Sequence, residues 1–365
     1  MRIICVVGAR PNFVKFAALW HEIKKYPEFE VTVVHTGQHY DDNMSAVFFR
    51  DLELSEPDYN LGISGGTATF QVSNIMREFE RVIVIEKPDM VMVFGDVNST
   101  LAAALVAAQY GIPLAHIEAG LRSGDMRMKE EINRKLTDHL SDVLFVTEDS
   151  GYENLVFENI DERKIHLVGN IMVDALLTMR QKAVKSRVLE DNNLTKYGYT
   201  LVTLHRAETI ENSEYLRIIM ETLEEITKTK YVLFPVHPHT LKKIGRELKA
   251  IGDGSPGLVC ISPLGYNDFI CALDNAYAVL TDSGGVQTEA CVLGIPCITM
   301  RTVTEHKSTV EYGNVVTGID KSSILHAFNN LNNKRADLPL TWDGKTAERI
   351  VSILKRMANQ KASAA

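Results

Sequence analysis

The segment LTDSGGVQTEA, residues 280–290, places small polar residues between an apolar run and a helix-forming run. Ser283, Gly284 and Gly285 would present backbone N–H groups and a hydroxyl at a helix N-terminus, where glycine lets a phosphate approach closely. Glu289 follows about one turn later, where its carboxylate can accept hydrogen bonds from hydroxyls such as those of a ribose. The pattern indicates a site for a diphosphate joined to a nucleoside. The structural alternative is a plain glycine turn capped by Asp282 or Ser283.

A second candidate anion site is the segment GARPNFVKF, residues 8–16. Arg10 and Lys15 place two cations beside a predicted helix N-terminus, which itself attracts anions. The segment matches neither the GxxxxGK[ST] phosphate loop nor the GxGxxG dinucleotide fingerprint. An ordinary strand-to-helix turn that carries two surface cations is the alternative interpretation.

Three carboxylates follow predicted strands of the first half of the chain. Asp96 comes directly after an apolar strand, Glu118 ends the next strand, and Glu130 begins the segment EEINR. A carboxylate at the carboxyl edge of a parallel sheet faces the ligand crevice and can act as a general acid or base. The structural alternatives are helix capping by Asn98 or Ser99 and an i, i+4 pair of Glu130 with Arg134 on a solvated helix.

Histidines gather at predicted strand ends. Five of the eleven are expected at or just after such an end: His35, His39, His116, His205 and His237. No HxxxH or HxH pair with a supporting carboxylate motif occurs, so no metal site is expected. Together with Arg206, histidines in these places are better suited to hold diphosphate oxygens.

Short apolar β-rich runs alternate with stretches of helical spacing along the whole chain, which is typical of βαβ units and buried parallel sheets. A stretch without a strong strand separates two such series. We therefore expect two Rossmann-like, doubly wound α/β domains, at residues 1–172 and 195–344. An amphipathic helix at about residues 345–360 should pack on another element.

The composition excludes several classes of protein. With 365 residues, 45% of them hydrophobic, the chain can form about two domains, and its net charge of −8 without a Lys/Arg block argues against nucleic-acid binding. No apolar run reaches the roughly 18 residues that span a membrane, and the first residues lack the features of a signal peptide. We expect a cytoplasmic protein. Its five cysteines lie mostly in apolar runs and are expected to be small core residues, not disulfides or zinc ligands.

Nine segments, taken together, carry a family resemblance. GARPNFVK, HTGQHYDDNMS, GDVNST, HIEAGLRSGD, EEINR, TLHR, PVHP, LTDSGGVQTEA and TEHKSTVEYG occur in the order and spacing of the non-hydrolysing UDP-N-acetylglucosamine 2-epimerases, which this chain resembles over nearly its whole length. The resemblance implies the glycosyltransferase-B fold, with the site in the cleft between two domains and a C-terminal helix that returns to the first. It also implies a cytoplasmic homodimer that acts on a small-molecule UDP-sugar without a cofactor and feeds cell-surface polysaccharide synthesis.

The resemblance further implies a mechanism and roles for residues. The family eliminates UDP across C1–C2 to give 2-acetamidoglucal and adds UDP back after protonation of the other face. By motif position, Asp96, Glu118, Glu130 and His205 are the catalytic candidates. The candidate substrate-binding residues are Arg10, Lys15, Arg206, His237, Phe269, Ser283, Gly284, Gly285 and Glu289. Gln38, His39 and His237 match the place where a second UDP-GlcNAc activates some members.

Two departures from the family pattern bear on the substrate. Lys129 stands where the family usually has proline, and TEHK at residues 304–307 replaces TERP, so that His306 and Lys307 must supply the charge of the missing arginine. A UDP-sugar with a modified ring, such as a diacetamido uronic acid, is therefore an alternative substrate. An inverting UDP-sugar glycosyltransferase of the same fold, a hydrolysing epimerase and a nucleotide-sugar sensor are the other classes considered.

Overall fold

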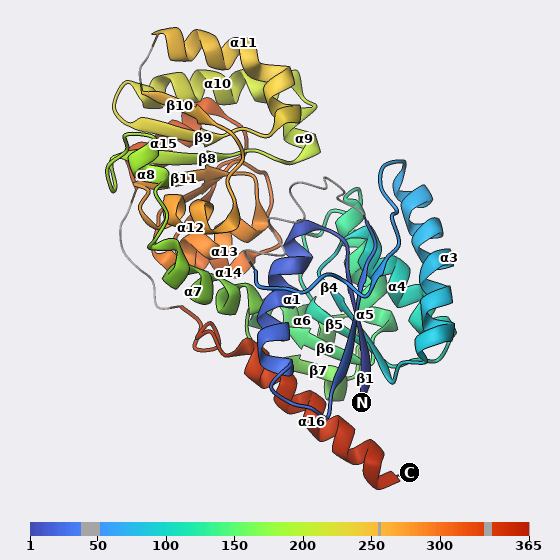
Figure 1. Cartoon of the computed structure of the whole chain (residues 1–365). Coiled ribbons are helices and arrows are strands. Elements are labelled where there is room, and N and C mark those ends of the chain that lie inside the picture. The colour runs from blue at the N-terminus through green and yellow to red at the C-terminus, as the bar shows by residue number, and fades with distance from the viewer. Residues whose placement is uncertain (38–51, 255–256, 332–337, 365) are drawn as a thin grey trace. The chain divides into compact units, whose positions relative to one another are not determined.

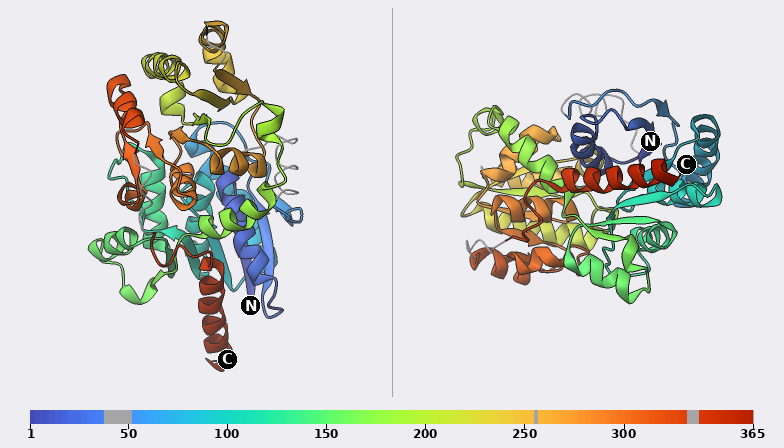
Figure 2. Two further views of the ribbon diagram at one scale, coloured as in Figure 1. Left: turned by 90° about the vertical axis from the view of Figure 1, so that its left-hand side faces the viewer. Right: turned by 90° about the horizontal axis from the view of Figure 1, so that it is seen from below.

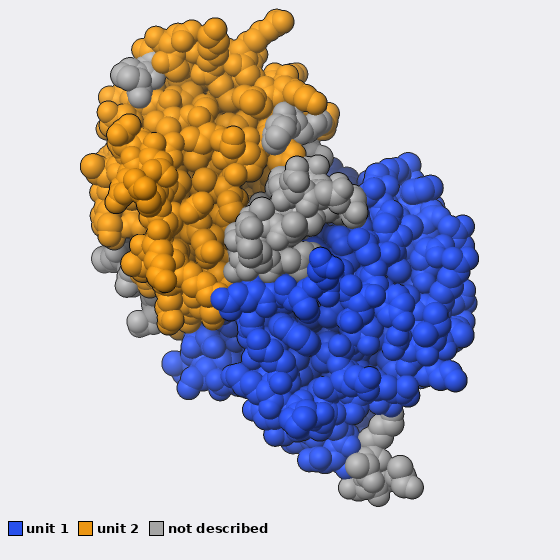
Figure 3. All heavy atoms as spheres, viewed as in Figure 1, with its two compact units in different colours: residues 1–175, 339–365 blue, residues 176–338 orange. Residues whose placement is uncertain are grey.

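The computed structural model describes residues 1–37, 52–254, 257–331 and 338–364. They form two compact units (Figure 3). Unit 1 contains Met1–Ala175 together with Pro339–Ala365, and unit 2 contains Leu176–Leu338. Each unit is a parallel sheet flanked by helices (Figure 1), which confirms the predicted α/β class.

The sheet of unit 1 has the order β3-β2-β1-β4-β5-β6-β7, and each of its strand pairs is parallel. Its strands are β1 Arg2–Val7, β2 Glu30–His35, β3 Tyr59–Asn60, β4 Met90–Phe94, β5 Leu114–Ala119, β6 Val143–Val146 and β7 Ile165–Leu167. The chain winds outward in both directions from the neighbours β1 and β4. The loops that follow these two strands therefore border the switch point, where open α/β sheets bind ligands.

Helices cover both faces of this sheet. They are α1 Arg10–Ile23, α3 Ala68–Glu86, α4 Asn98–Gln109, α5 Lys129–Leu140, α6 Asp149–Phe157, the 3₁₀ helix η1 Glu162–Lys164, the first part of α7 Ile171–Ala183, and α16 Thr346–Ala364. Helices α3 and α4 bury residues such as Phe79 and Ala103 against alternate residues of β1 and β4. Helix α16 packs on α1 (Figures 1 and 2) and buries Ile350 and Leu354 from its predicted apolar stripe.

The sheet of unit 2 has the order β10-β9-β8-β11-β12-β13, again with parallel pairs. Its strands are β8 Tyr199–Thr203, β9 Tyr231–Pro235, β10 Leu258–Ile261, β11 Ala278–Thr281, β12 Cys297–Thr299 and β13 Asn314–Val316. The switch point lies between β8 and β11. The loops that follow these strands carry TLHR and LTDSGG, the two segments of this half richest in candidate residues.

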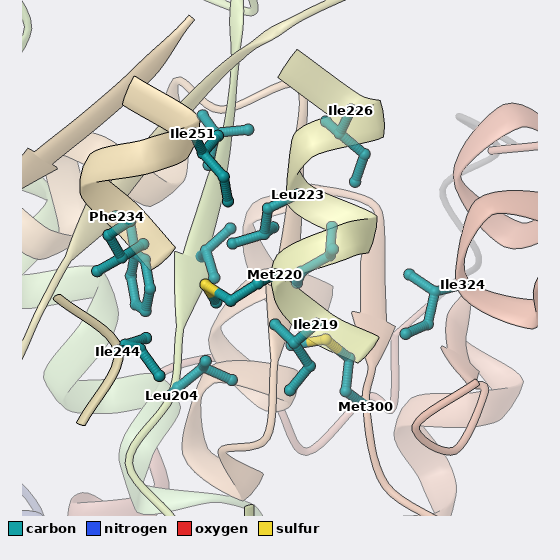
Figure 4. Packing of buried hydrophobic residues seen from close by; sticks show 14 of the residues in the cluster. Leu204, Ile219, Met220, Leu223, Ile226, Phe234, Ile244, Ile251, Met300 and Ile324 are labelled. Atoms are coloured by element: carbon teal, nitrogen blue, oxygen red, sulfur yellow. The ribbon is translucent and has the colours of Figure 1, made fainter. Parts of the chain in front are cut away.

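The helices of unit 2 complete an apolar core. After the rest of α7 they are α8 Val188–Asp191, α9 Ala207–Ile210, α10 Ser213–Thr227, α11 Pro238–Gly254, α12 Tyr266–Asp274, α13 Gly284–Leu293, α14 Lys307–Glu311 and α15 Lys321–Asn329. Figure 4 shows Ile219, Met220 and Leu223 of α10 among the buried side chains that include Phe234 and Ile324. This core fixes the strands whose ends carry the candidate site.

Four local expectations are wrong. Helix α4 begins at Asn98 itself, so Asn98 does not cap it, and Ser283 occupies the N-cap of α13 without a side-chain capping bond. His116 lies in the middle of β5, where it is fully buried, because the strand continues to Ala119. Cys260 is exposed, since β10 is an edge strand, whereas Cys5, Cys291 and Cys297 are buried as expected. None of the helices in the described residues is both long and apolar enough to cross a membrane.

Candidate functional site

The turn between β1 and α1 is fixed against the end of β4. The side-chain oxygen of Asn12 accepts the N–H groups of Gly8 and Ala9, and its amide nitrogen donates to the carbonyl of Phe94. A Cβ on Gly8 would lie 2.0 Å from the hydroxyl oxygen of Ser99, so only glycine fits. Arg10 is the first residue of α1, but its side chain lies outside the described residues.

Lys15 and Glu118 meet beside this turn. Glu118 has a left-handed backbone with φ of 73° and lies at an irregularity where the β5–β6 register shifts. Its carboxylate forms a buried ion pair with the Lys15 ammonium. A Cβ added to Gly95 would lie 2.9 Å from Lys15 Nζ and 3.1 Å from Glu118 Oε2. A non-glycine residue at positive φ costs about 1 kcal/mol and often marks a functional position.

Asp96 is held by the start of α5. Arg134 Nη1 lies 2.5 Å from Asp96 Oδ2, and Asn133 donates to the backbone carbonyl of Asp96 at 2.8 Å. Arg134 also binds Glu131, which accepts hydrogen bonds from the N–H and hydroxyl of Ser123. Burial alone would raise the pKa of Glu131, but these donors outweigh it and lower the pKa. Glu131 is therefore a buried carboxylate that orients Arg134.

Glu130 differs from its neighbour. It is half-buried at the second residue of α5, and it has no hydrogen bond or ion pair to any described residue. The alternative of an i, i+4 pair with Arg134 is wrong, because Arg134 pairs with Glu131 and Asp96 instead. Glu130 is thus a carboxylate available to a ligand, whereas Asp96 and Glu118 are each paired with a cation.

In unit 2, Asp282 organises the loop after β8. Its buried carboxylate accepts the backbone N–H groups of His205 and Arg206 and lies 2.9 Å from Nδ1 of the exposed His205 ring. Burial alone would raise the pKa of Asp282, but His205 and the backbone donors outweigh it and lower the pKa. The Asp282 contact fixes the orientation of the imidazole and leaves Nε2 as the atom that can contact a ligand.

The helix α13 begins against a group of charged side chains. A Cβ on Gly284 would lie 2.7 Å from Glu305 Oε1 and 2.9 Å from His306 Nε2. Glu305 pairs with Arg206 at 3.2 Å and with Arg301 at 2.8 Å. Burial alone would raise the pKa of Glu305, but the charges of His306, Arg301 and Arg206 outweigh it and hold the pKa well below its usual range. His306 of the TEHK segment is therefore buried at the N-terminus of α13.

The remaining candidates lie nearby in the same unit. Glu289 is buried in α13 and accepts a 2.7 Å hydrogen bond from the Tyr266 hydroxyl, and Phe269 follows on α12, half-buried. Ser283 and Gly285 are half-buried at the start of α13, and a Cβ on Gly285 would meet no atom within 4 Å. His237 is exposed after β9.

Some residues fall outside these groups. Gln38 and His39 lie outside the described residues. His116 is too deeply buried to hold a ligand. Within the described ranges, no three histidine, cysteine, aspartate or glutamate side chains gather as a metal ion requires. Sequence reasoning missed the positioning role of Asn12 and Glu305, although both stand inside segments that it singled out, next to glycines or cations.

Comparison with known proteins shows a match along the chain. A family model described as UDP-N-acetylglucosamine 2-epimerase matches residues 21–355. The UDP-N-acetylglucosamine 2-epimerase of Methanocaldococcus jannaschii is 41% identical over 363 residues, which cover 97% of this chain and 99% of that protein. The UDP-2,3-diacetamido-2,3-dideoxy-D-glucuronate 2-epimerase of Pseudomonas aeruginosa is 40% identical over 366 residues, covering 98% and 100%.

Solved structures agree with these matches. The M. jannaschii UDP-GlcNAc 2-epimerase, crystallised with UDP-GlcNAc and UDP, superimposes with a TM-score of 0.90 at 41% identity over 98% of this chain and 100% of that one. The UDP-GlcNAc 2-epimerase of Neisseria meningitidis, bound to UDP-GlcNAc, gives a TM-score of 0.89 at 29% identity with the same coverage.

Proposed function

The chain belongs to the UDP-N-acetylglucosamine 2-epimerase family, and we propose that it interconverts UDP-N-acetylglucosamine and UDP-N-acetylmannosamine at C2 without releasing the free sugar. Besides the family, one observation carries this proposal: the grouping of Lys15, Glu118 and Asp96 around Gly95 at the switch point of unit 1. Carboxylates held by cations, together with Glu130, which has no partner among the described residues, suit the proton transfers of this reaction.

The reaction proceeds through elimination and addition. A carboxylate removes the C2 proton while the C1–O bond to UDP breaks, and the electron pair of the C2–H bond forms the C1=C2 double bond of 2-acetamidoglucal. A second group then delivers a proton to the other face of C2, and UDP adds back to C1. Asp96, Glu118 and Glu130 are the candidates for these proton transfers. Lys15 stabilises negative charge as it develops.

Unit 2 supplies the groups that bind UDP. The backbone N–H groups of Gly284 and Gly285 and the hydroxyl of Ser283 suit the diphosphate, because a helix N-terminus favours negative charge. The backbone N–H of Ser283 itself donates to the Thr281 hydroxyl at 3.0 Å. His205, which Asp282 orients, adds a hydrogen-bond donor that can stabilise the negative charge that develops on the leaving phosphate. Glu289 suits the ribose hydroxyls, as its carboxylate has accepting capacity beyond the Tyr266 bond.

A second candidate substrate has support of its own. The P. aeruginosa enzyme named for UDP-2,3-diacetamido-2,3-dideoxy-D-glucuronate is 40% identical to this chain, close to the 41% of the M. jannaschii UDP-GlcNAc 2-epimerase. The TEHK segment places His306 at the α13 N-terminus, beside the region proposed for the diphosphate. Side-by-side kcat/KM values for the two UDP-sugars decide between them, and a larger value for the uronate would assign this alternative.

Proton NMR in heavy water tests the proposed reaction. Purified protein incubated with UDP-GlcNAc should yield UDP-ManNAc, with deuterium at C2 of both epimers. Release of free N-acetylmannosamine with UDP would instead assign a hydrolysing epimerase. Tight UDP binding without turnover of either UDP-sugar would leave the glycosyltransferase or sensor as the function.

The family resemblance also supports four finer proposals: a homodimer, a cytoplasmic location, a product that feeds cell-surface polysaccharide synthesis, and activation by a second UDP-GlcNAc at Gln38, His39 and His237. Light scattering after size exclusion tests the dimer. Initial rates from pure UDP-ManNAc test the activation, because an activated enzyme shows a lag that added UDP-GlcNAc removes.

A further inference from the structure

His116 occupies an unusual place in unit 1. It is the third residue of β5 and is completely buried, two residues before Glu118. Its Nδ1 lies 2.6 Å from Asp138 Oδ1, and its Nε2 lies 2.8 Å from the backbone carbonyl oxygen of Gly95. The ring thus joins the loop that follows β4 to helix α5.

Each of the two ring contacts requires a proton. A carbonyl oxygen cannot donate, so Nε2 must carry the proton of the contact with Gly95. Asp138 Oδ2 accepts the N–H of Gly120 at 3.1 Å and Arg122 Nη1 at 2.7 Å, so only Oδ1 could hold a carboxyl proton. A proton also lies between Oδ1 and Nδ1, and Nδ1 carries it where Asp138 is a carboxylate.

The surrounding charges favour this state. Burial alone would raise the pKa of Asp138, but His116 and Arg122 outweigh it and lower the pKa, so that Asp138 is a carboxylate. Glu158 binds Arg122 through both carboxylate oxygens, at 2.9 and 2.7 Å, and Lys135 approaches Glu158 at 3.2 Å. The charges of Asp138, Arg122, Glu158 and Lys135 thus alternate in sign, and a charged ring at position 116 continues the alternation.

The groups held by His116 and Asp138 are backbone atoms next to the proposed catalytic acids. Gly95 precedes Asp96 and has φ of 63°, and Gly120 follows two residues after Glu118 with φ of 83°. Glycine adopts such conformations readily, but the left-handed backbone of the non-glycine Glu118 is unfavourable and needs support from its surroundings. We infer that His116 is a doubly protonated positioning residue, which holds the Gly95 carbonyl directly and the Gly120 N–H through Asp138, and thereby places Asp96 and Glu118 for catalysis.

This inference rests on the proposed function only for its kinetic readout. In the part of the chain that the structure describes, His116 has no hydrogen bond or ion pair with Asp96 or Glu118, so its effect reaches the reaction through the backbone. An ordinary core histidine would affect only stability. A positioning residue also affects kcat in a protein that remains folded, because a displacement of about 1 Å can slow a reaction roughly 100-fold.

Two substitutions separate the two hydrogen bonds. The amide nitrogen of His116→Asn lies near the place of Nδ1 and can keep the bond to Asp138, but it cannot reach Gly95. The amide nitrogen of His116→Gln lies near the place of Nε2 and can keep the Gly95 bond. We expect H116N to lose about 100-fold in kcat, with KM for UDP-GlcNAc changed by less than about threefold, and H116Q to retain at least about tenfold more activity than H116N.

A matched control is His166→Asn. His166 lies in β7 of the same sheet and is half-buried, far along the strand order from β4. H166N should keep wild-type kcat. Melting temperatures of the three variants show whether each is folded. Equal activity of folded H116N and wild type, or equal loss in H116N and H116Q, would overturn the positioning role.

Nitrogen-15 NMR of histidine-labelled wild-type protein tests the protonation state without any turnover. The two ring nitrogens of His116, assigned by their loss in H116N, should each show a one-bond proton coupling at pH 7.5, without and with UDP. A ring nitrogen without a proton at pH 7.5 would overturn the inference. If the wild type turns over no UDP-sugar, the proposed function fails while this spectrum still decides the state of His116.

Discussion

The ammonium of Lys15 and the carboxylate of Glu118 form a buried ion pair directly beside the Cα of Gly95. Lys15 comes from α1 and Glu118 from the irregular end of β5, so the pair joins the helix that follows β1 to the end of β5. Separating such a pair costs several kcal/mol, because each charge would be left buried without its partner. The pair is therefore both a structural link and the centre of the proposed proton-transfer site.

The first prediction concerns Glu118→Gln. The amide keeps the shape of the side chain but neither accepts a proton as a base nor neutralises Lys15. We expect kcat to fall by about 10²–10⁴-fold, with the deuterium exchange at C2 slowed to a similar extent. Glu153→Gln changes an exposed glutamate on α6 and should leave the rate unchanged. Wild-type exchange in folded E118Q would remove Glu118 from the catalytic candidates.

A second prediction concerns Gly95→Ala, which tests the space that a side chain at residue 95 would occupy. The methyl of Gly95→Ala would lie 2.9 Å from Lys15 Nζ and 3.1 Å from Glu118 Oε2, and it also meets a φ of 63°. Gly111→Ala is a matched control, because its φ is 62° and no atom lies within 4 Å of the added Cβ. Both variants should lose about 1 kcal/mol of stability from the left-handed backbone.

Only Gly95→Ala should lose activity, by about 100-fold, since only its methyl displaces the ion pair. Urea unfolding and initial rates of the two variants measure the two effects separately. Equal rates for both variants would show that the exact placement of Lys15 and Glu118 does not matter to turnover.

The third prediction concerns the start of α13. The methyl of Gly284→Ala would lie 2.7 Å from Glu305 and 2.9 Å from His306, so one of them must move. We expect UDP to bind roughly tenfold more weakly, by about 1.4 kcal/mol in calorimetry. Gly252→Ala, in α11 of the same unit, meets no atom within 4 Å and should bind UDP as the wild type does.

Gly285→Ala adds a useful comparison, because the structure leaves open space where its methyl would lie. If the diphosphate occupies that space, G285A weakens UDP binding while its melting temperature stays unchanged. Wild-type affinity in both G284A and G285A would exclude the N-terminus of α13 as the diphosphate site.

The sequence predicts the folds of the units well because their signals are local. Apolar runs such as MVMVF and helical stripes such as that of α16 report burial directly, and glycines mark the turns at strand ends. The features that the sequence does not predict depend on partners that are distant along the chain. Glu131 and Glu130 are adjacent glutamates that the sequence alone does not distinguish. Glu131 is buried against Arg134 and Ser123, whereas Glu130 has no partner among the described residues.

His116 shows the same limit. Its place two residues before Glu118 suggests a strand-end ligand, whereas its contacts with Gly95 and Asp138 lie 21 and 22 residues away along the chain. The TEHK segment could be singled out by its departure from the family pattern, but its contact with the start of α13 follows only from the fold.

The fourth prediction concerns the pH dependence of the contribution of Glu131 to stability. The pKa of Glu131 is lowered in the folded protein, so its contribution to stability is present above the ordinary glutamate value of 4.5 and is lost as pH falls through the folded pKa. Glu131→Gln should therefore destabilise unit 1 at pH 7 by about 3 kcal/mol, and the difference from wild type should shrink below pH 4.5. Urea unfolding followed by tryptophan fluorescence measures it, since both tryptophans, Trp20 and Trp342, lie in unit 1.

The stability of Asp174→Asn should change with pH in the direction opposite to that of Glu131→Gln. Burial raises the pKa of Asp174, and the hydrogen bond from the N–H of Ala347 at the start of α16 offsets this only in part. The contribution of Asp174 to stability is therefore fully present below the ordinary aspartate value of 3.8 and is lost as pH rises through the folded pKa. Asp174→Asn removes the cost of burying the charge and can still accept the Ala347 N–H. The stability of D174N relative to wild type should therefore increase as pH rises from 3.5 to 7, whereas that of E131Q decreases. If the two variants changed in the same direction, the assigned states of these carboxylates would be wrong.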